Sequence, residues 1–144
     1  MDYITGCSLL FRKELIDSIG LMHEDYFLYF EETDWNIRAK QNGWGIRYVP
    51  DSIVYHKVSI SSGGENNLAP YVDYYQLRNL IAMILRTQKG LIKTVSLVNI
   101  FTILLKKLIK IFIKNQNRKL ERTTFLFKAV NDGFKQKMGN MLNN

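Results

Sequence analysis

Short apolar runs, separated by polar and glycine-containing turns, characterise the first half of the chain. Three of these runs have the length and the β-type composition of strands: residues 6–11, 46–49 and 52–56. Helices are expected over residues 12–19 and 33–42, because Gly20 and Gly43 follow these segments and glycine commonly ends a helix. The pattern predicts a mixed α/β structure for this half.

The second half has the pattern of an all-helical region. Three long segments can each form a helix: residues 71–88, 91–114 and 119–137. A polar, glycine-rich stretch over residues 59–67 precedes them and is expected to be a loop. Its residues 59–64 form either a plain surface loop or a lid over a bound nucleotide or metal. We therefore expect two domains, residues 1–70 and residues 71–144.

Charge is distributed unevenly between these two parts. Residues 1–70 contain six Lys or Arg and ten Asp or Glu, for a net charge of −4. Residues 71–144 contain fourteen Lys or Arg and three Asp or Glu, for a net charge of +11. Such an asymmetry indicates that the second part meets an anionic surface. The basic residues lie on apolar helices without a recognised nucleic-acid-binding module, so nucleic acid is not the expected partner.

An acidic cluster stands where the helix over residues 33–42 is expected to begin. Glu31, Glu32 and Asp34 follow an aromatic stretch that ends in Phe30. One interpretation is structural, since acidic side chains in a first turn satisfy free N–H groups and the helix dipole. The other is catalytic: closely spaced carboxylates suit a general base, and aromatic neighbours suit a sugar-binding surface.

Two further residues are candidate ligands for charged groups. His56 ends a β-type run beside the polar loop, where it is either a structural histidine or a metal ligand. Arg78 follows two tyrosines on an expected helix, where it either lies on the helix surface or meets a phosphate of a donor or acceptor.

The segment over residues 91–114 combines an apolar centre with basic flanks. Residues 94–105 carry no charge, and lysines stand on both sides of them. Twelve uncharged residues are few for a transmembrane span, whereas a basic amphipathic helix suits the surface of an anionic bilayer. The alternative is a helix that packs inside the protein.

Taken in order, these features resemble the C-terminal half of family 2 glycosyltransferases of the rhamnosyltransferase-like type. The resemblance covers roughly residues 3–90 and rests on an ordered series of short motifs. They are GCSLLFRK at 6–13, IGLMHEDYF at 19–27, EETD at 31–34, YH at 55–56 followed by SSG at 61–63, and YY at 74–75 followed by RN at 78–79.

The resemblance implies an α/β fold class: the C-terminal part of a GT-A (nucleotide-diphospho-sugar transferase) domain, followed by a helical tail. Residues 1–70 would be the acceptor-side part of the catalytic domain, and residues 71–144 a basic tail that associates with a membrane. The implied activity is an inverting transfer of a sugar from a nucleotide sugar to a cell-surface glycan or a lipid-linked acceptor. The implied location is cytoplasmic, at the inner face of the plasma membrane.

The same resemblance assigns roles to residues. The catalytic base falls on Glu32, with Asp34 as the second catalytic candidate; the family usually has Asp at the position of Glu32. His56 would contact a divalent metal, Mg or Mn, or the diphosphate. The family's nucleotide-binding half and its DxD motif have no counterpart in this sequence, so an upstream GT-A half is an expected partner and the isolated chain is expected to be inactive. The rival hypothesis is a non-catalytic protein that binds a membrane surface or a partner protein through its basic helices.

Overall fold

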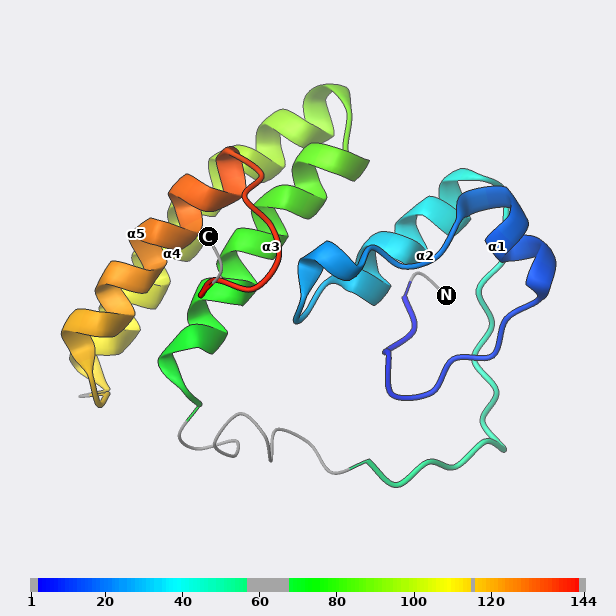
Figure 1. Cartoon of the computed structure of the whole chain (residues 1–144), viewed down its shortest axis with the longest axis horizontal. Coiled ribbons are helices and arrows are strands. Elements are labelled where there is room, and N and C mark those ends of the chain that lie inside the picture. Colours follow the sequence, from blue (N-terminus) through cyan, green and yellow to red (C-terminus); the bar gives the residue numbers. More distant parts are fainter. Residues whose placement is uncertain (1–2, 57–67, 115, 143–144) are drawn as a thin grey trace.

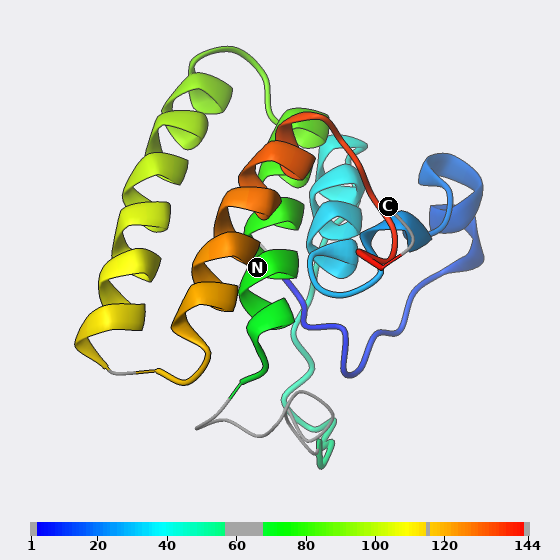
Figure 2. The same cartoon turned by 60° about the vertical axis from the view of Figure 1, so that its left-hand side comes forward.

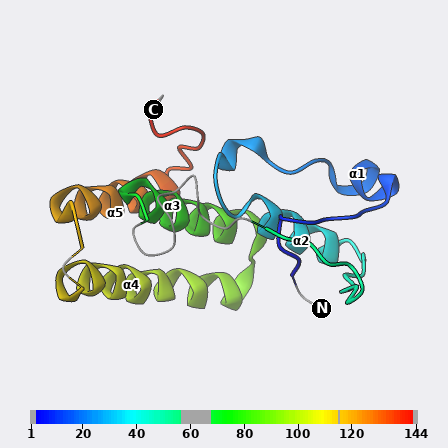
Figure 3. The ribbon, with the colours of Figure 1, turned by 90° about the horizontal axis from the view of Figure 1, so that it is seen from below.

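Three long helices form the larger part of the molecule. The computed structural model describes residues 3–56, 68–114 and 116–142. The long helices are α3 (Pro70–Thr87), α4 (Gly90–Ile113) and α5 (Lys119–Phe134). Their bounds lie within three residues of the ranges expected from the sequence, which confirms these three helices. Helices α3 and α5 lie in one layer with α4 beneath them (Figure 3).

Helix α3 is the centre of this arrangement. Pro70 occupies its first turn, where the missing N–H costs nothing, and residues on nearly all of its faces are buried. Helix α5 packs closely against it at Gly133, where an added Cβ would lie 3.0 Å from the carbonyl oxygen of Arg78. The main core gathers aliphatic and aromatic side chains of the three helices, which lie side by side in Figure 2.

Short helices and loops make up the first part of the chain. They are α1 (Lys13–Ile19), the 3-10 turn η1 (Glu24–Tyr26) and α2 (Glu31–Gln41). Helix α2 begins two residues earlier than expected, because Phe30 takes a left-handed conformation with φ 74° and its carbonyl accepts the N–H of Asp34. Leu15, Trp35 and Ala39 form a small second core between α1 and α2.

The expected α/β fold class is wrong. Throughout residues 3–56, 68–114 and 116–142 the structure contains helices and no strand, so it is not the C-terminal part of a GT-A sheet. The described residues of the three expected strands run without ladder hydrogen bonds. Leu10 is 100% exposed and Tyr55 is 95% exposed. A strand exists only through hydrogen bonds to a neighbouring strand, and no described segment supplies one.

Contacts between the two parts of the chain are polar as well as apolar. Tyr26 belongs to the same core as α3, α4 and α5, and Asp25 forms an ion pair of 2.6 Å with Arg86. The segment after α5 returns to this region, where the N–H of Gly139 donates to the carbonyl of Asp25 (Figure 1). The division into domains at residue 70 stays a prediction, as does the role of residues 59–64, which lie outside the described residues.

Candidate functional site

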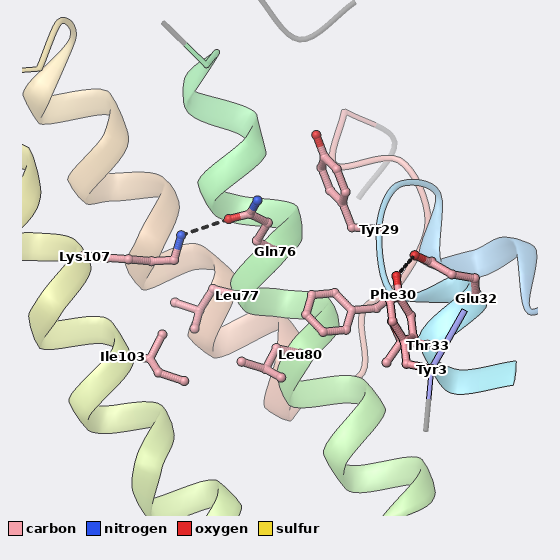
Figure 4. Close-up of a pocket in the computed structure, with 10 residues that line it drawn as sticks. All are labelled: Tyr3, Tyr29, Phe30, Glu32, Thr33, Gln76, Leu77, Leu80, Ile103 and Lys107. Carbon is pink, nitrogen blue, oxygen red and sulfur yellow. Dashed lines mark hydrogen bonds between the residues drawn. The ribbon is translucent and has the colours of Figure 1, made fainter. Parts of the chain in front are cut away.

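An open pocket lies where the start of α2 meets α3 and α4 (Figure 4). Its volume is about 310 Å³. Aromatic and aliphatic side chains form most of the wall, and a few polar groups stand among them. The lining residues are Tyr3, Tyr29, Phe30, Glu32, Thr33, Gln76, Leu77, Leu80, Ile103 and Lys107. An apolar pocket with a few polar groups is the usual form of a small-molecule site.

Glu32 supplies the carboxylate of this pocket. It lies in the first turn of α2 and is half-buried, and its Oε1 accepts a hydrogen bond of 2.7 Å from the Tyr3 hydroxyl. Burial and this hydrogen bond raise the pKa of Tyr3 to about 12, so the hydroxyl remains a donor at neutral pH. Tyr3 thereby fixes the orientation of a carboxylate that also borders open space.

The opposite wall carries a positive charge that is already paired. Lys107 Nζ lies 2.8 Å from Asp73 Oδ1 and 3.1 Å from Gln76 Oε1, so α4 is tied to α3 across the pocket floor. Figure 4 shows the Phe30 ring extending between this wall and Glu32. Nothing in the sequence pattern singled out Lys107, Gln76 or Tyr3, because they come from segments far apart in the chain.

A strained loop holds the aromatic side of the pocket. Phe27, Tyr29 and Phe30 all have positive φ, between 66° and 74°, a conformation that is uncommon for residues other than glycine. The Asn79 side chain on α3 donates to the backbone carbonyls of Tyr26, Leu28 and Tyr29. These bonds hold the loop in the conformation that starts α2 at Glu31.

Arg78 lies in the interior beside this loop. Its side chain is 0% exposed, and its guanidinium donates to Asn79 Oδ1, to the carbonyl of Gly139 and to the carbonyl of Tyr26. The rings of Tyr74 and Tyr75 lie within 5.3 Å of it. Arg78 does not line the pocket, and its contact with a donor phosphate stays a prediction.

Asp34 stands two residues after Glu32, so its side chain lies on a different side of α2. It is 1% exposed, and it accepts hydrogen bonds from the Tyr26 hydroxyl and from Arg38 Nε, which lies 2.7 Å away. These partners neutralise a carboxylate that would otherwise be costly to bury. The structure brings Glu32, and not Asp34, to the pocket.

Glu31 is the third acid of the cluster. Its Oε2 is buried and has no hydrogen-bond partner among the described atoms, and burial raises the pKa of this carboxyl group. A hydrogen bond from its own backbone N–H lowers the pKa and opposes part of this effect. The three acids therefore occupy three different environments, although they are close in sequence.

His56 is exposed at the end of the extended segment that follows α2. The described part of the chain gathers no group of three or more His, Cys, Asp or Glu side chains suited to a metal ion. The structure does not bring His56 to the pocket that contains Glu32. Its role as a metal contact stays a prediction.

A second groove of about 200 Å³ continues from the pocket between α3 and α4. Leu80 and Ile103 belong to both hollows, and Gln88, Ser96 and Asn99 lie farther along the second one. Because they share Leu80 and Ile103, the two hollows lie next to each other along the seam of α3 and α4.

Comparison with known proteins gives partial matches to rhamnosyltransferases. The N-acetylglucosaminyl-diphospho-decaprenol L-rhamnosyltransferase of Mycobacterium tuberculosis is 34% identical over 63 residues, which cover 44% of this chain and 20% of that protein. The dTDP-rhamnosyl transferase RfbF of Shigella flexneri is 26% identical over 128 residues, which cover 85% of this chain and 42% of that protein.

No protein-family model matches the chain, and no solved structure is significantly similar to it. The matched regions span between a fifth and about two fifths of the length of these relatives. Over those regions the chain is similar to rhamnosyltransferases at low identity.

Proposed function

We propose that the chain forms the acceptor-side part of a glycosyltransferase and that Glu32 is its general base. The observation that carries the proposal is the Glu32 carboxylate at an open, aromatic-lined pocket, held by the Tyr3 hydroxyl at 2.7 Å. Aromatic walls suit the apolar face of a sugar ring, and a carboxylate suits one of its hydroxyl groups. The partial similarity to rhamnosyltransferases supports the same conclusion.

In the proposed reaction, an acceptor hydroxyl donates a hydrogen bond to the Glu32 carboxylate and transfers its proton to it. The acceptor oxygen then forms a bond to the anomeric carbon of the donor sugar. The bond between that carbon and the diphosphate oxygen breaks, the nucleoside diphosphate leaves, and the anomeric configuration inverts. Tyr3 orients the carboxylate through its hydrogen bond.

The names of these two relatives suggest the substrates to test first. We propose a nucleotide-linked rhamnose as donor and a lipid-diphosphate-linked sugar as acceptor. The matched regions cover at most 42% of these relatives, so we propose that donor binding needs protein sequence beyond this chain. The isolated chain is then expected to bind acceptor without transferring sugar.

The test replaces Glu32 by Gln in a protein that joins this chain to a nucleotide-binding portion. Gln keeps the size of the side chain and still accepts the Tyr3 hydrogen bond, but it cannot take a proton as a carboxylate does. We expect kcat to fall by about 10²–10⁴-fold with a small change in KM, as is typical for loss of a general base. Transfer of labelled sugar to the lipid-linked acceptor measures both constants.

Two control variants separate catalysis from folding. Glu14→Gln makes the same chemical change in the first turn of α1, away from the pocket, and should leave kcat unchanged. Asp34→Asn should mainly lower the melting temperature, because it weakens the buried pair with Arg38. A Glu32→Gln protein that retains kcat within about threefold would remove Glu32 from the role of base.

A further inference from the structure

Helix α4 exposes an apolar face along its whole length. Within the 24 residues of the helix, Phe101 is 71% exposed and Val98 is 69% exposed. The exposed apolar residues are Leu91, Ile92, Val95, Val98, Phe101, Leu105, Ile109, Phe112 and Ile113. Spacings of three and four recur through this set, so its members share one side of the helix.

Side chains on the opposite side of α4 pack the helix against the rest of the protein. Ile100 and Ile111 are buried in the main core, and Lys107 pairs with Asp73 on α3. The exposed apolar face is therefore additional to the face that α4 needs for packing. At a rise of about 1.5 Å per residue, the helix is about 36 Å long.

A row of lysines borders this apolar face on one side. Lys106, Lys110 and Lys114 are exposed and recur every four residues, and α4 contains no acidic residue. Lys106 and Lys110 stand three and seven residues after Ile103, so they lie on the same side of α4 as the groove to α3. Apolar and cationic strips thus run in parallel beside the pocket.

We propose that this face of α4 docks on the surface of an anionic lipid bilayer. The apolar strip would enter the acyl boundary while the lysine row meets the headgroups, as in interfacial amphipathic helices. Charge disfavours the pairing of this face with the α4 of a second copy, because α4 offers no carboxylate to pair with the other helix's lysines. None of the described helices has the length and apolar character needed to cross a bilayer.

Docking in this orientation would bring the groove between α3 and α4 close to the headgroups. If the proposed function is correct, a lipid-linked acceptor would reach Glu32 along this groove without leaving the membrane surface. Only this placement rests on the proposed function; the docking itself rests on the exposed face and the lysine row of α4.

The experiment measures partition of the full 144-residue chain onto sucrose-loaded vesicles by co-sedimentation. One set of vesicles is zwitterionic phosphatidylcholine, and the other also contains about one third phosphatidylglycerol. We expect binding to the anionic vesicles that falls as salt is raised, and much weaker binding to the neutral ones. Lys106→Gln with Lys110→Gln should weaken binding about 30-fold, which corresponds to about 1 kcal/mol per lysine.

Matched variants place the contact on α4. Lys135→Gln with Lys137→Gln removes the same charge from exposed positions after α5 and should change binding by less than about threefold. Phe101→Ser should weaken binding by roughly tenfold or more, whereas Phe127→Ser, a similarly exposed change on α5, should not.

Three vesicle-binding results would overturn the proposal. They are equal binding to neutral and anionic vesicles, equal losses in the α4 and control variants, and absence of binding to either vesicle. Self-association of the chain in sedimentation equilibrium that Phe101→Ser abolishes would assign the face to a second copy instead. Sugar transfer is not measured in any of these arms, so their outcome is independent of the role of Glu32.

Discussion

Asn79 is the residue whose removal should most clearly show how the pocket is held. It is 0% exposed on α3, and its side-chain amide donates to the carbonyls of Tyr26, Leu28 and Tyr29. Its carbonyl oxygen accepts from Arg78 Nε at 2.8 Å. Asn79→Ala removes both functions while leaving the helix-forming character of α3 intact.

The expected loss of stability follows from these contacts. The side-chain amide of Asn79 has two hydrogens, which the three loop carbonyls share. The hydrogen bond from Arg78 Nε to the Asn79 carbonyl oxygen is a further bond that the substitution removes. Each lost hydrogen bond is worth about 1 kcal/mol, and a buried partner left unpaired costs about 1–3 kcal/mol. We expect Asn79→Ala to lower the free energy of unfolding by about 3–5 kcal/mol.

Urea denaturation followed by circular dichroism measures this change. Asn99→Ala is the matched control, because Asn99 is exposed on α4 and its replacement should alter the free energy of unfolding by no more than about 0.5 kcal/mol. If Asn79→Ala were as mild as this control, the carbonyls of the loop would be satisfied without Asn79, and the account of how α2 is positioned would be wrong.

Two other predictions concern packing and charge. Gly133→Val should lower the free energy of unfolding by about 2 kcal/mol or more, because the Cβ alone would lie 3.0 Å from the carbonyl oxygen of Arg78. Thermal melts measure the loss. Gly45→Val is the control, because nothing lies within 4 Å of a Cβ added there. The hydrogen bond from Arg86 holds the pKa of Asp25 below its ordinary value of 3.8. The folded state therefore binds fewer protons at Asp25 than the unfolded state does. This stabilisation of the folded state is present above about pH 4 and is lost as the pH falls below that value. Urea melts between about pH 6 and about pH 2 should show this loss, and a slope unchanged by Asp25→Asn would contradict it.

The sequence by itself determined the helices and the site of the acidic cluster. Residues 71–88, 91–114 and 119–137 were recognisable because helical hydrogen bonds join residues close in sequence, and Pro70 and Gly20 mark helix boundaries through local backbone preferences. The same local logic placed Glu31, Glu32 and Asp34 at the start of a helix. The basic, apolar character of residues 91–114 was also visible without coordinates.

Only the tertiary structure decided which segments pair or pack with one another and which side chains are buried or line the pocket. The run at 6–11 has a strand's composition, but a strand depends on a partner elsewhere in the chain, and within the described residues it has none. The sequence leaves Arg78 either on the helix surface or at a phosphate, and the structure shows its guanidinium buried against backbone carbonyls. Glu32 and Asp34 are two residues apart, and one faces a pocket while the other is buried beside Arg38. Such differences arise from contacts across long stretches of sequence, which local pattern does not encode.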